Sequence, residues 1–558
     1  MKLLKFEIGE SSFRSLYPGF QVVFRDENKI RQEELETFGP FCMAGLNGTG
    51  KSNVLEALAA IFYHLECCVD KFRPESLRAF RRDKCFPDAY CLEYLIQPLS
   101  EAPNAENFDF VRIIKKVGTE PRMYVCKWRK GVRLQNISLR PKSVNGLQQA
   151  AEGKRFLPDI VVGYSSGENE ILSIPFIKSR LINFDKYCSD YRNKYRYEEP
   201  ENSLIYVDET MSQAVLLACM MFEKKETTLE FLERELQVRD IASFRMHINE
   251  QVLQESKVSV TDHIVDIVEQ LKAYATCWYR SELLNESADV SCPVLILDFW
   301  VNDQTKEAFR LLFHDALSCF RFFQTLYELN ANFLPESIKE EVYTSQGVYT
   351  QGKLPEPSPT QDVFHFLDFM ILKNVGTEKR AKKLLLREFS DGEHQFLHAM
   401  GICLMLKNKR CLMLLDEPET HFNPEWRSKF VETLDRSLQA SACNNLQKEI
   451  ILTSHSSYIL SDCRADKVLI FQRKDDNVVS VQSAEQANIR TYGTSANLLN
   501  SRIFQTTQTV GDHARRSFDR YYSRLRKEGC SKELIREIDD EMGDSIEKEL
   551  LIGQFIGQ

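Results

Sequence analysis

The chain has 558 residues and is 43% hydrophobic and 11% aromatic, which excludes a disordered protein and allows roughly two to four domains. Its formal net charge of −9 excludes a uniformly basic protein that coats duplex nucleic acid, so any nucleic-acid contact must be a local patch. No apolar run reaches the roughly 20 residues of a membrane span, and the start MKLLKFEIGE lacks a signal-peptide core. The 16 cysteines include no C-x-x-C pair, which favours free thiols. We therefore expect a cytoplasmic protein with no membrane segment.

The first predicted element with chemical meaning is a P-loop. Gly45–Ser52 has the pattern G-x-x-x-x-G-K-S, follows an apolar stretch and opens a helix with one apolar face. Backbone N–H groups of this loop and of the helix start can bind a polyphosphate such as ATP. Lys51 can reach the β- and γ-phosphates, and Ser52 can ligate Mg²⁺. The predicted ATP-binding residues are Asn47, Gly48, Thr49, Gly50, Lys51, Ser52 and Asn53.

A basic hairpin follows the P-loop helix. Arg112–Lys142 holds ten Lys or Arg residues against one acid, and its pattern predicts two strands with a turn at Gly118–Pro121. Tyr124 and Trp128 are interleaved with the charges, as on surfaces that hold a nucleic-acid backbone and stack a base. The candidate nucleic-acid contacts are Lys127, Arg129 and Lys130. The same pattern also fits a solvated hairpin face, so both interpretations stay open.

The middle of the chain changes character. From about 172 to 345, an apolar spacing of three and four without a sustained heptad predicts a compact helical insertion and not a coiled-coil arm. A loop rich in Gly, Pro and Ser covers 343–362. Strands and helices then alternate to about 505, before a charged helical tail. The predicted fold class is α/β.

Two predicted strands end in residues with candidate chemical roles. The stretch RCLMLLDEPETHFNP predicts a buried strand, Cys411–Leu415, that ends in two acids. Asp416 can hold Mg²⁺ and Glu417 can polarise the attacking water, because phosphoryl transfer requires mainly positioning and charge. The stretch EIILTSHSSYIL predicts a further strand, and His455 at its end can contact the γ-phosphate. Adjacent acids also occur in surface turns and single histidines are often structural, but the P-loop upstream favours catalytic roles.

A polar turn precedes the acid pair. The stretch LREFSDGEHQFLHAM predicts a helix entered through Ser390-Asp391-Gly392-Glu393. A helix cap accounts for the serine but not for a glycine two residues later. A second Ser-x-Gly-Glu, in the stretch YSSGENE at 164–170, lies about 250 residues before the acid pair and ends the first strand-rich region.

The order of these motifs resembles the ABC-type ATPase heads of SMC, Rad50 and OLD-like proteins, within the AAA-family ATPases. In that family a large insertion separates Walker A from Walker B, a Ser-x-Gly signature precedes Walker B, and a switch histidine follows it. The resemblance implies a P-loop ATPase head made of an N-terminal lobe, 1–171, and a C-terminal lobe, 365–505. A helical insertion, 172–364, would separate the lobes, and a helical tail would cover 506–558.

The same resemblance assigns further residues. It implies that Ser390, Gly392 and Glu393 contact the ATP held by a second copy of the head, so that the chain forms a head-to-head homodimer. It also places YSSGENE where the family keeps its Q-loop, with Glu168 or Asn169 in place of the glutamine.

Segments after His455, TYGTSANLLNSRIF and GDHARRSF, resemble the PtuA ATPases of Septu-type antiphage systems, including those attached to retrons. The resemblance implies an ATPase that uses ATP and Mg²⁺ and controls a partner HNH nuclease of the PtuB type. In the retron version, a reverse transcriptase and its small DNA–RNA product would hold the complex inactive. The acids of the tail lie in a predicted helix, so we expect no nuclease site within the chain.

Two other functions remain open from the sequence. One is an ABC-type ATPase of DNA repair or recombination that acts on DNA ends without a toxic effector. The other is a nucleotide-gated clamp with negligible turnover. The identity of the neighbouring genes and a turnover assay would separate these possibilities.

Overall fold

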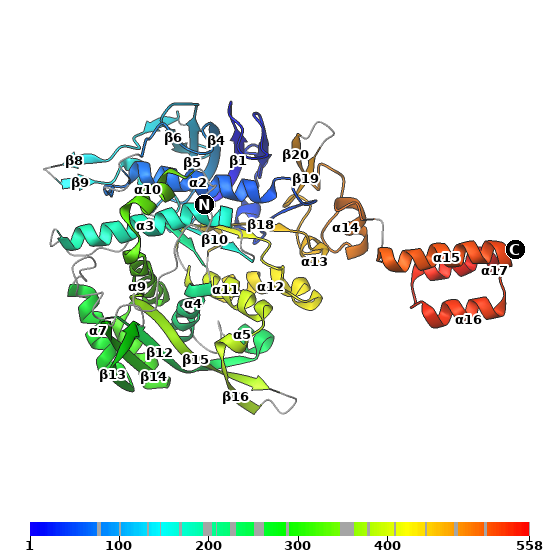
Figure 1. The fold of residues 1–558 in the computed structure, drawn as a ribbon. Coiled ribbons are helices and arrows are strands. Elements are labelled where there is room, and N and C mark those ends of the chain that lie inside the picture. Colours follow the sequence, from blue (N-terminus) through cyan, green and yellow to red (C-terminus); the bar gives the residue numbers. More distant parts are fainter. Residues whose placement is uncertain are drawn as a thin grey trace. The chain divides into compact units, whose positions relative to one another are not determined.

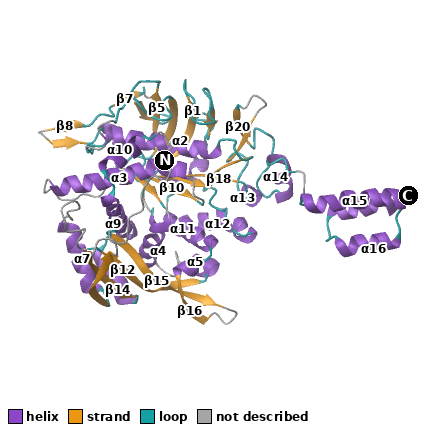
Figure 2. Ribbon diagram, viewed as in Figure 1, coloured by secondary structure: helices purple, strands orange, loops and turns teal. Residues whose placement is uncertain are grey.

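The computed structural model describes the chain apart from residues 75–76, 78–79, 100–101, 131–132, 145–146, 167–169, 193–202, 208, 224–229, 250–261, 286–289, 346–361, 376–379, 407–408, 441–443, 474–477, 507–510 and 557–558. The chain divides into two compact units, Met1–Thr494 and Ser495–Gln558 (Figures 1 and 2). The predicted divisions at 171, 364 and 505 stay predictions.

A seven-stranded sheet forms the centre of the first unit, in the order β11-β10-β17-β18-β3-β19-β20. All neighbouring pairs are parallel except β19 and β20. The strands are β3 (Phe41–Gly45), β10 (Ile160–Ser165), β11 (Leu204–Tyr206), β17 (Cys411–Asp416), β18 (Lys448–Ser454), β19 (Val468–Arg473) and β20 (Val479–Ser483). β3, β17 and β18 are buried along their whole lengths, as expected for parallel strands covered on both faces. Their carboxyl ends therefore meet at one edge of the sheet.

A second, antiparallel sheet has the order β2-β1-β4-β5-β6-β7. Its strands are β1 (Lys2–Ile8), β2 (Gln21–Val23), β4 (Tyr90–Ile96), β5 (Asp109–Lys115), β6 (Arg122–Lys127) and β7 (Gln135–Ile137). Helix α2 (Lys51–Val69) lies between the two sheets (Figure 1). One core cluster contains side chains of both sheets and of α2, including Phe6, Leu58, Tyr94 and Leu414. The predicted hairpin is confirmed, because β5 pairs with β6 around Gly118.

A third sheet combines three strands of the predicted insertion, which were not expected there, with two strands from the start of the predicted C-terminal lobe. Its order is β13-β14-β12-β15-β16, and it is antiparallel throughout. The strands are β12 (Val238–Ile248), β13 (Cys277–Asn285), β14 (Val290–Trp300), β15 (Phe364–Val375) and β16 (Arg380–Leu385). The mixed α/β fold contains the predicted helices, and this region contains strands in addition to those helices. Phenylalanines of β12, β14 and β15 pack on helices α8 and α9 through Phe309 and Phe323.

The remaining helices of the first unit follow the chain. They are α1 (Gln32–Glu36), α3 (Glu170–Arg192), α4 (Glu209–Phe222), α5 (Glu230–Leu236), α7 (Asp262–Tyr274), α8 (Asp303–Leu312), α9 (Ala316–Leu329), α10 (Glu336–Thr344), α11 (Asp391–Met405), α12 (Pro424–Ala440) and α13 (Ser457–Ser461). A short strand pair, β8 (Lys142–Val144) with β9 (Leu147–Gln149), completes the unit. Of the described helices, α2 is long and apolar enough to cross a membrane, but 83% of its most apolar window is buried inside the protein, which is typical of a core helix. Every cysteine that the structure describes is free.

Glu449, in β18, connects the N-terminal part of the chain to the parallel sheet. Its carboxylate accepts the Leu3 backbone N–H at 2.6 Å and pairs with Arg25 at 2.5 Å. The side chains of Arg25 and Glu449 are both 2% exposed. Because burial of an unpaired charge would be unfavourable, Glu449 depends on Arg25, which also lies 3.4 Å from Glu34. This pair therefore ties residues 3–25 to a strand more than 400 positions later.

The second unit, Ser495–Gln558, is helical, as predicted for the tail. It comprises α14 (Ala496–Ile503), α15 (Asp512–Glu528), α16 (Lys532–Glu541) and α17 (Ile546–Ile556). Tyr521, Leu525, Leu534 and Ile538 form its small core. The acids of the tail take part in this packing, since Glu537 pairs with Arg524 at 2.6 Å.

Candidate nucleotide-binding site

The P-loop connects β3 to α2, and two of its glycines are required by geometry. Gly45 has φ +150°, and a Cβ there would lie 2.4 Å from the Phe471 carbonyl oxygen. Gly50 has φ +89°, and a Cβ would meet the Ser15 hydroxyl at 2.8 Å. Any other side chain would therefore strain the loop. The strand–loop–helix context predicted for this motif is confirmed.

The first turn of α2 has no side-chain cap. Its N-cap is Gly50, which has no side chain to accept a hydrogen bond, and no acid lies in the first turn. The first N–H groups of a helix have no partner within the helix, and the helix dipole is positive there. An anion is the partner that this arrangement favours. The loop residues Asn47 and Gly48 are exposed, whereas Thr49 and Gly50 are buried beneath them.

Lys51 folds back over the loop. Its ammonium donates to the carbonyl oxygens of Gly45 at 3.0 Å and Leu46 at 3.1 Å. Burial lowers the pKa of Lys51, and the nearby Glu417 and Asp416 carboxylates oppose that shift. The positive charge is therefore held inside the loop, where a phosphate would lie. Asn53 in the same turn donates to the Ser15 hydroxyl at 2.7 Å.

Ser52 and Asp416 meet across the edge of the parallel sheet. The Ser52 hydroxyl donates to Asp416 Oδ1 at 2.8 Å, although the two residues are 364 positions apart. Asp416 is the last residue of β17 and is buried. A hydroxyl and a carboxylate are oxygen ligands of the kind that Mg²⁺ prefers, so this pair fits the predicted metal contact.

Glu417 and His455 form the second contact at this edge. His455 Nε2 lies 3.2 Å from Glu417 Oε1. The hydrogen bond from His455 lowers the pKa of Glu417, more than burial raises it, so the carboxylate is ionised at neutral pH. Glu417 has φ +46°, a left-handed conformation that costs a non-glycine residue about 1 kcal/mol or more. Such strain persists where the surrounding structure fixes a side chain, and here it points the carboxylate towards His455.

Thr453 is a site residue that the sequence analysis missed. Its hydroxyl donates to Asp416 Oδ1 at 2.6 Å and accepts the Glu417 backbone N–H at 2.9 Å. One side chain of β18 thus orients both acids of the pair. The available signal was its place in the stretch LTSH, two residues before His455, but the register of β17 on β18 is what aligns Thr453 with Asp416.

The signature turn caps α11. The Ser390 hydroxyl accepts the Glu393 N–H at 3.3 Å, and the Glu393 carboxylate accepts the Ser390 N–H at 3.0 Å. This reciprocal pair is a capping box. Lys373 of β15 forms an ion pair with Glu393, and the resulting hydrogen bonds lower the pKa of Glu393 although burial opposes them. Ser390 itself is exposed.

Contacts within the same chain leave no space for a side chain at Gly392. A Cβ at this position would lie 2.8 Å from the His421 carbonyl oxygen and 3.3 Å from the Trp426 ring. The loop after Asp416-Glu417 therefore packs directly on the signature turn. A Gly392→Asp change would disturb this packing, so it cannot test a contact with a second chain separately. The proposed contact of Ser390, Gly392 and Glu393 with a partner's nucleotide stays a prediction.

The basic hairpin carries fewer available charges than its sequence indicates. Trp128 is 3% exposed and packs in a small apolar cluster with Phe108, so its proposed stacking on a base is wrong. Lys127 pairs with Asp109 at 3.0 Å, and Arg129 lies 4.0 Å from the centre of the Trp128 ring. Several charged side chains of the hairpin are therefore engaged in contacts within the chain. A nucleic-acid role for Lys127, Arg129 and Lys130 stays a prediction.

The YSSGENE stretch ends β10 beside β17. Ser166 donates to the Thr420 hydroxyl at 2.9 Å, and its carbonyl oxygen accepts the Gln395 side-chain amide at 3.0 Å. Glu168 and Asn169, proposed for the Q-loop position, lie outside the described residues. Gln395, in α11, is therefore an amide at this edge that the sequence analysis did not select.

Comparisons with known proteins add one family. A family described as "AAA domain, putative AbiEii toxin, Type IV TA system" matches residues 310–461. This range is less than half of the chain and contains the signature turn, the acid pair and His455. No curated protein matches the chain. Among solved structures, the SMC head domain from Thermotoga maritima aligns over 87% of this chain and 99% of that chain, with 10% identity and a TM-score of 0.30.

The site geometry and the family match agree on the coarse assignment. Ser52, Asp416, Glu417, Thr453 and His455 converge at the edge of the parallel sheet where the uncapped start of α2 lies. The matched range supplies the acid pair and His455 of this site, and the P-loop at Gly45–Ser52 supplies its phosphate-facing side, which together are the parts of an ATPase site.

Proposed function

We propose that this chain is the ATP-binding and ATP-hydrolysing subunit of an antiphage defence complex, and that it controls a separate nuclease of the HNH type. The observation that carries the ATPase part is the direct contact of Ser52 with Asp416 beside the uncapped α2 start. In this proposal Lys51 and the N–H groups of Asn47–Asn53 hold the phosphates. Ser52 and Asp416 hold Mg²⁺, which would neutralise phosphate charge.

The hydrolytic roles follow from the same edge. Glu417 accepts a proton from the attacking water, because its lowered pKa keeps it ionised at neutral pH. His455 orients Glu417 and senses the γ-phosphate, while Thr453 fixes both acids. A head-to-head pair of chains, with Ser390 contributing to the partner's nucleotide, is part of the proposal.

The defence role rests on a sequence resemblance and on the description of the matching family. The segments 491–504 and 511–518 resemble the PtuA group, and the matching family is described as a putative toxin of a toxin–antitoxin system. Both favour a chain whose activity is linked to a toxic effector over an ATPase of DNA repair. A reverse transcriptase with its small DNA–RNA product is a further proposed partner where a retron is present.

The enzymatic test uses two variants. Lys51→Ala should abolish ATP binding, because the loop loses its phosphate-facing charge. Glu417→Gln should keep ATP binding but lower turnover by about 100-fold or more. Lys29→Ala, at a side chain that is 83% exposed, is the control. Equilibrium ATP binding and phosphate release are the measurements, and a wild-type turnover rate in Glu417→Gln would remove the assignment of the base.

The defence test uses cells. Cells that carry this gene with its neighbouring genes should survive phage challenge, and the Lys51→Ala variant should lose that protection. An adjacent gene for an HNH nuclease is expected. If Lys51→Ala and Glu417→Gln both protected cells as well as the wild type while lacking ATP turnover, the link between ATP and defence would be wrong.

A further inference from the structure

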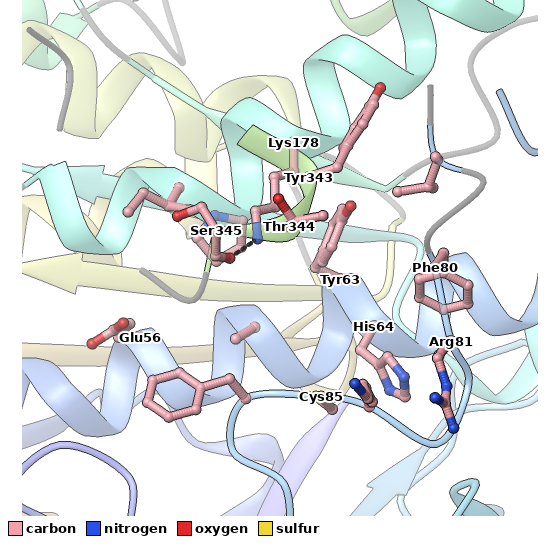
Figure 3. A pocket seen from close by; sticks show the side chains of 16 residues that line it. Glu56, Tyr63, His64, Phe80, Arg81, Cys85, Lys178, Tyr343, Thr344 and Ser345 are labelled. Atoms are coloured by element: carbon pink, nitrogen blue, oxygen red, sulfur yellow. Dashed lines mark hydrogen bonds between the residues drawn. The ribbon is translucent and has the colours of Figure 1, made fainter. Parts of the chain in front are cut away.

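A cavity of about 370 Å³ lies beside α2, beyond the first turn of that helix. It is lined by residues of α2, α3 and the end of α10, together with the segment that contains Phe80 and Phe86 (Figure 3). Its volume is in the range of small-molecule sites. Most of its wall is apolar, with aromatic rings of Tyr63, Phe80 and Tyr343.

One buried cation in this wall has no carboxylate partner. The Lys178 residue is 9% exposed, and its ammonium donates to the Ser345 carbonyl oxygen at the end of α10. Within the described part of the chain, no acid lies within ion-pair distance of it. Burial lowers the pKa of Lys178 to about 8, so the side chain still carries its charge at pH 7. A buried ammonium without a counter-charge is unfavourable, and an anion would relieve that cost.

A weakly satisfied polar group faces the same space. The Tyr63 hydroxyl is buried and lies against the Cys67 thiol, which is only a weak hydrogen-bond partner. Tyr63 is 8% exposed. The Lys178 ammonium lies 5.8 Å from the centre of the Tyr63 ring, and both side chains line the cavity (Figure 3).

The lining of the cavity also carries more positive than negative charge. Glu56 is the acid among the described lining residues, and Arg14 already pairs with it at 2.9 Å. Lys84 is exposed and lines the same cavity, whereas Arg81 beside it pairs with Asp83 at 2.5 Å. An anion that approaches therefore meets the charge of Lys84 outside and that of Lys178 inside.

We propose that this cavity binds a small organic anion with an aromatic or apolar body, whose charged group contacts Lys178 and the Tyr63 hydroxyl. The apolar body would lie against Leu77 and Phe80. A carboxylate and a phosphate ester share this chemistry. The site is separate from the nucleotide site, and the inference does not depend on the proposed function.

The simpler explanation is that Lys178 serves only to cap α10. It accounts for the hydrogen bond to Ser345, because cations and lysine donors stabilise helix C-termini. It does not account for the cavity itself or for the weakly satisfied Tyr63 hydroxyl beside it. The two explanations differ in what Lys178→Met should do. Capping alone predicts a loss of stability and no effect on ligands.

The test is a fluorescence titration of the full chain with 8-anilinonaphthalene-1-sulfonate, an anion with an aromatic body. The expected result is saturable binding at one site that excess Mg·ATP does not displace. Lys178→Met, which keeps an unbranched side chain one atom shorter and removes its charge, should weaken this binding at least tenfold. Ala60→Leu, which fills the cavity and keeps Lys178, should weaken it as well.

Competition identifies the source of the anion. Phenyl phosphate or benzoate should displace the probe, and benzyl alcohol at the same concentration should not. The stronger of the two competitors indicates whether the natural ligand is a phosphate ester or a carboxylate. The proposal is overturned if the wild type shows no saturable binding, if Mg·ATP or benzyl alcohol displaces the probe, or if a folded Lys178→Met chain binds it with unchanged affinity. If Lys178→Met does not fold, unchanged binding by Ala60→Leu overturns the proposal instead.

Discussion

Helices α2 and α11 begin in opposite chemical environments. The first turn of α2 has a glycine N-cap, no side-chain hydrogen bond and no acid. The first turn of α11 has a complete capping box and two acids, Asp391 and Glu393. The first arrangement leaves N–H groups for an external anion, whereas the second satisfies its own helix. A helix start is therefore an anion site only when the chain leaves it uncapped.

This difference sharpens the proposed contact across a head dimer. Glu393 is partly neutralised by Lys373, so the charge of the α11 start is lower than its sequence indicates. Ser390 remains exposed while it caps the helix. A phosphate at the α11 start would therefore meet only its outermost groups, and the contact with a partner's nucleotide stays a prediction. Four changes test this contrast.

The largest effect is expected from giving α2 the acid that α11 has. Asn53 occupies the same position in α2 as Glu393 does in α11, the third residue of the helix. Asn53→Glu should weaken ATP binding about thirtyfold, because repulsion between close charges reaches about 2 kcal/mol in a partly buried site. Asn53→Gln is the uncharged control. Equal ATP affinities of the two variants, measured by calorimetry, would contradict the anion role of this turn.

The second change adds charge to α11 without removing its cap. Asp and Asn cap helices about as well as Ser, so Ser390→Asp and Ser390→Asn should both fold normally. Only Ser390→Asp would oppose a partner's γ-phosphate, and it should lower turnover about tenfold while a single head still binds ATP. Steady-state phosphate release checks this. If the two variants behave alike, Ser390 does not face a nucleotide.

The third change concerns packing. Gly392→Ala would place a Cβ 2.8 Å from the His421 carbonyl oxygen, and the free energy of unfolding should fall by about 1–3 kcal/mol. Gly39→Ala is the control, since its Cβ would meet the Lys467 side chain at 3.8 Å. Denaturant unfolding measures both. A Gly392→Ala chain as stable as the wild type would mean that the loop after Glu417 yields without cost.

The smallest effect is expected from Glu393→Gln. The change weakens the capping box and leaves Lys373 unpaired, so it should cost about 1 kcal/mol at pH 7. The folded pKa of Glu393 is lowered, so its contribution is complete above the unfolded pKa and is lost as the pH falls through the folded pKa. The difference in stability between variant and wild type should therefore shrink below about pH 4. A constant difference down to pH 3 would show that the carboxylate charge is not involved.

Local motifs made much of the nucleotide site predictable. Gly45–Ser52 requires a strand before it and a helix after it, and the acid pair and His455 each follow a buried apolar run. Parallel strands align their carboxyl ends, so these residues had to meet once the strands paired. Thr453 was not predictable in the same way, because its role depends on the register of β18 against β17.

Long-range pairing explains the parts that the sequence did not reveal. β12 pairs with β15 across more than one hundred residues, and the helices between them dominate the apolar spacing. A tryptophan between charged residues gives the same sequence pattern whether its ring is exposed or buried. The Trp128 ring is buried because it packs in a cluster that includes Ile30 and Leu35, and both of these residues are distant from Trp128 in the sequence.

The pairing of Arg25 with Glu449 has a consequence for synthesis. The ribosome adds about 5–20 residues per second, so β1 and Arg25 wait about 20–90 s before the buried acid emerges. Over that interval an open strand edge belongs to an unfinished sheet, and such edges promote aggregation. Folding of the first unit should accordingly be slow and largely post-translational, and fragments that end before β18 should be insoluble.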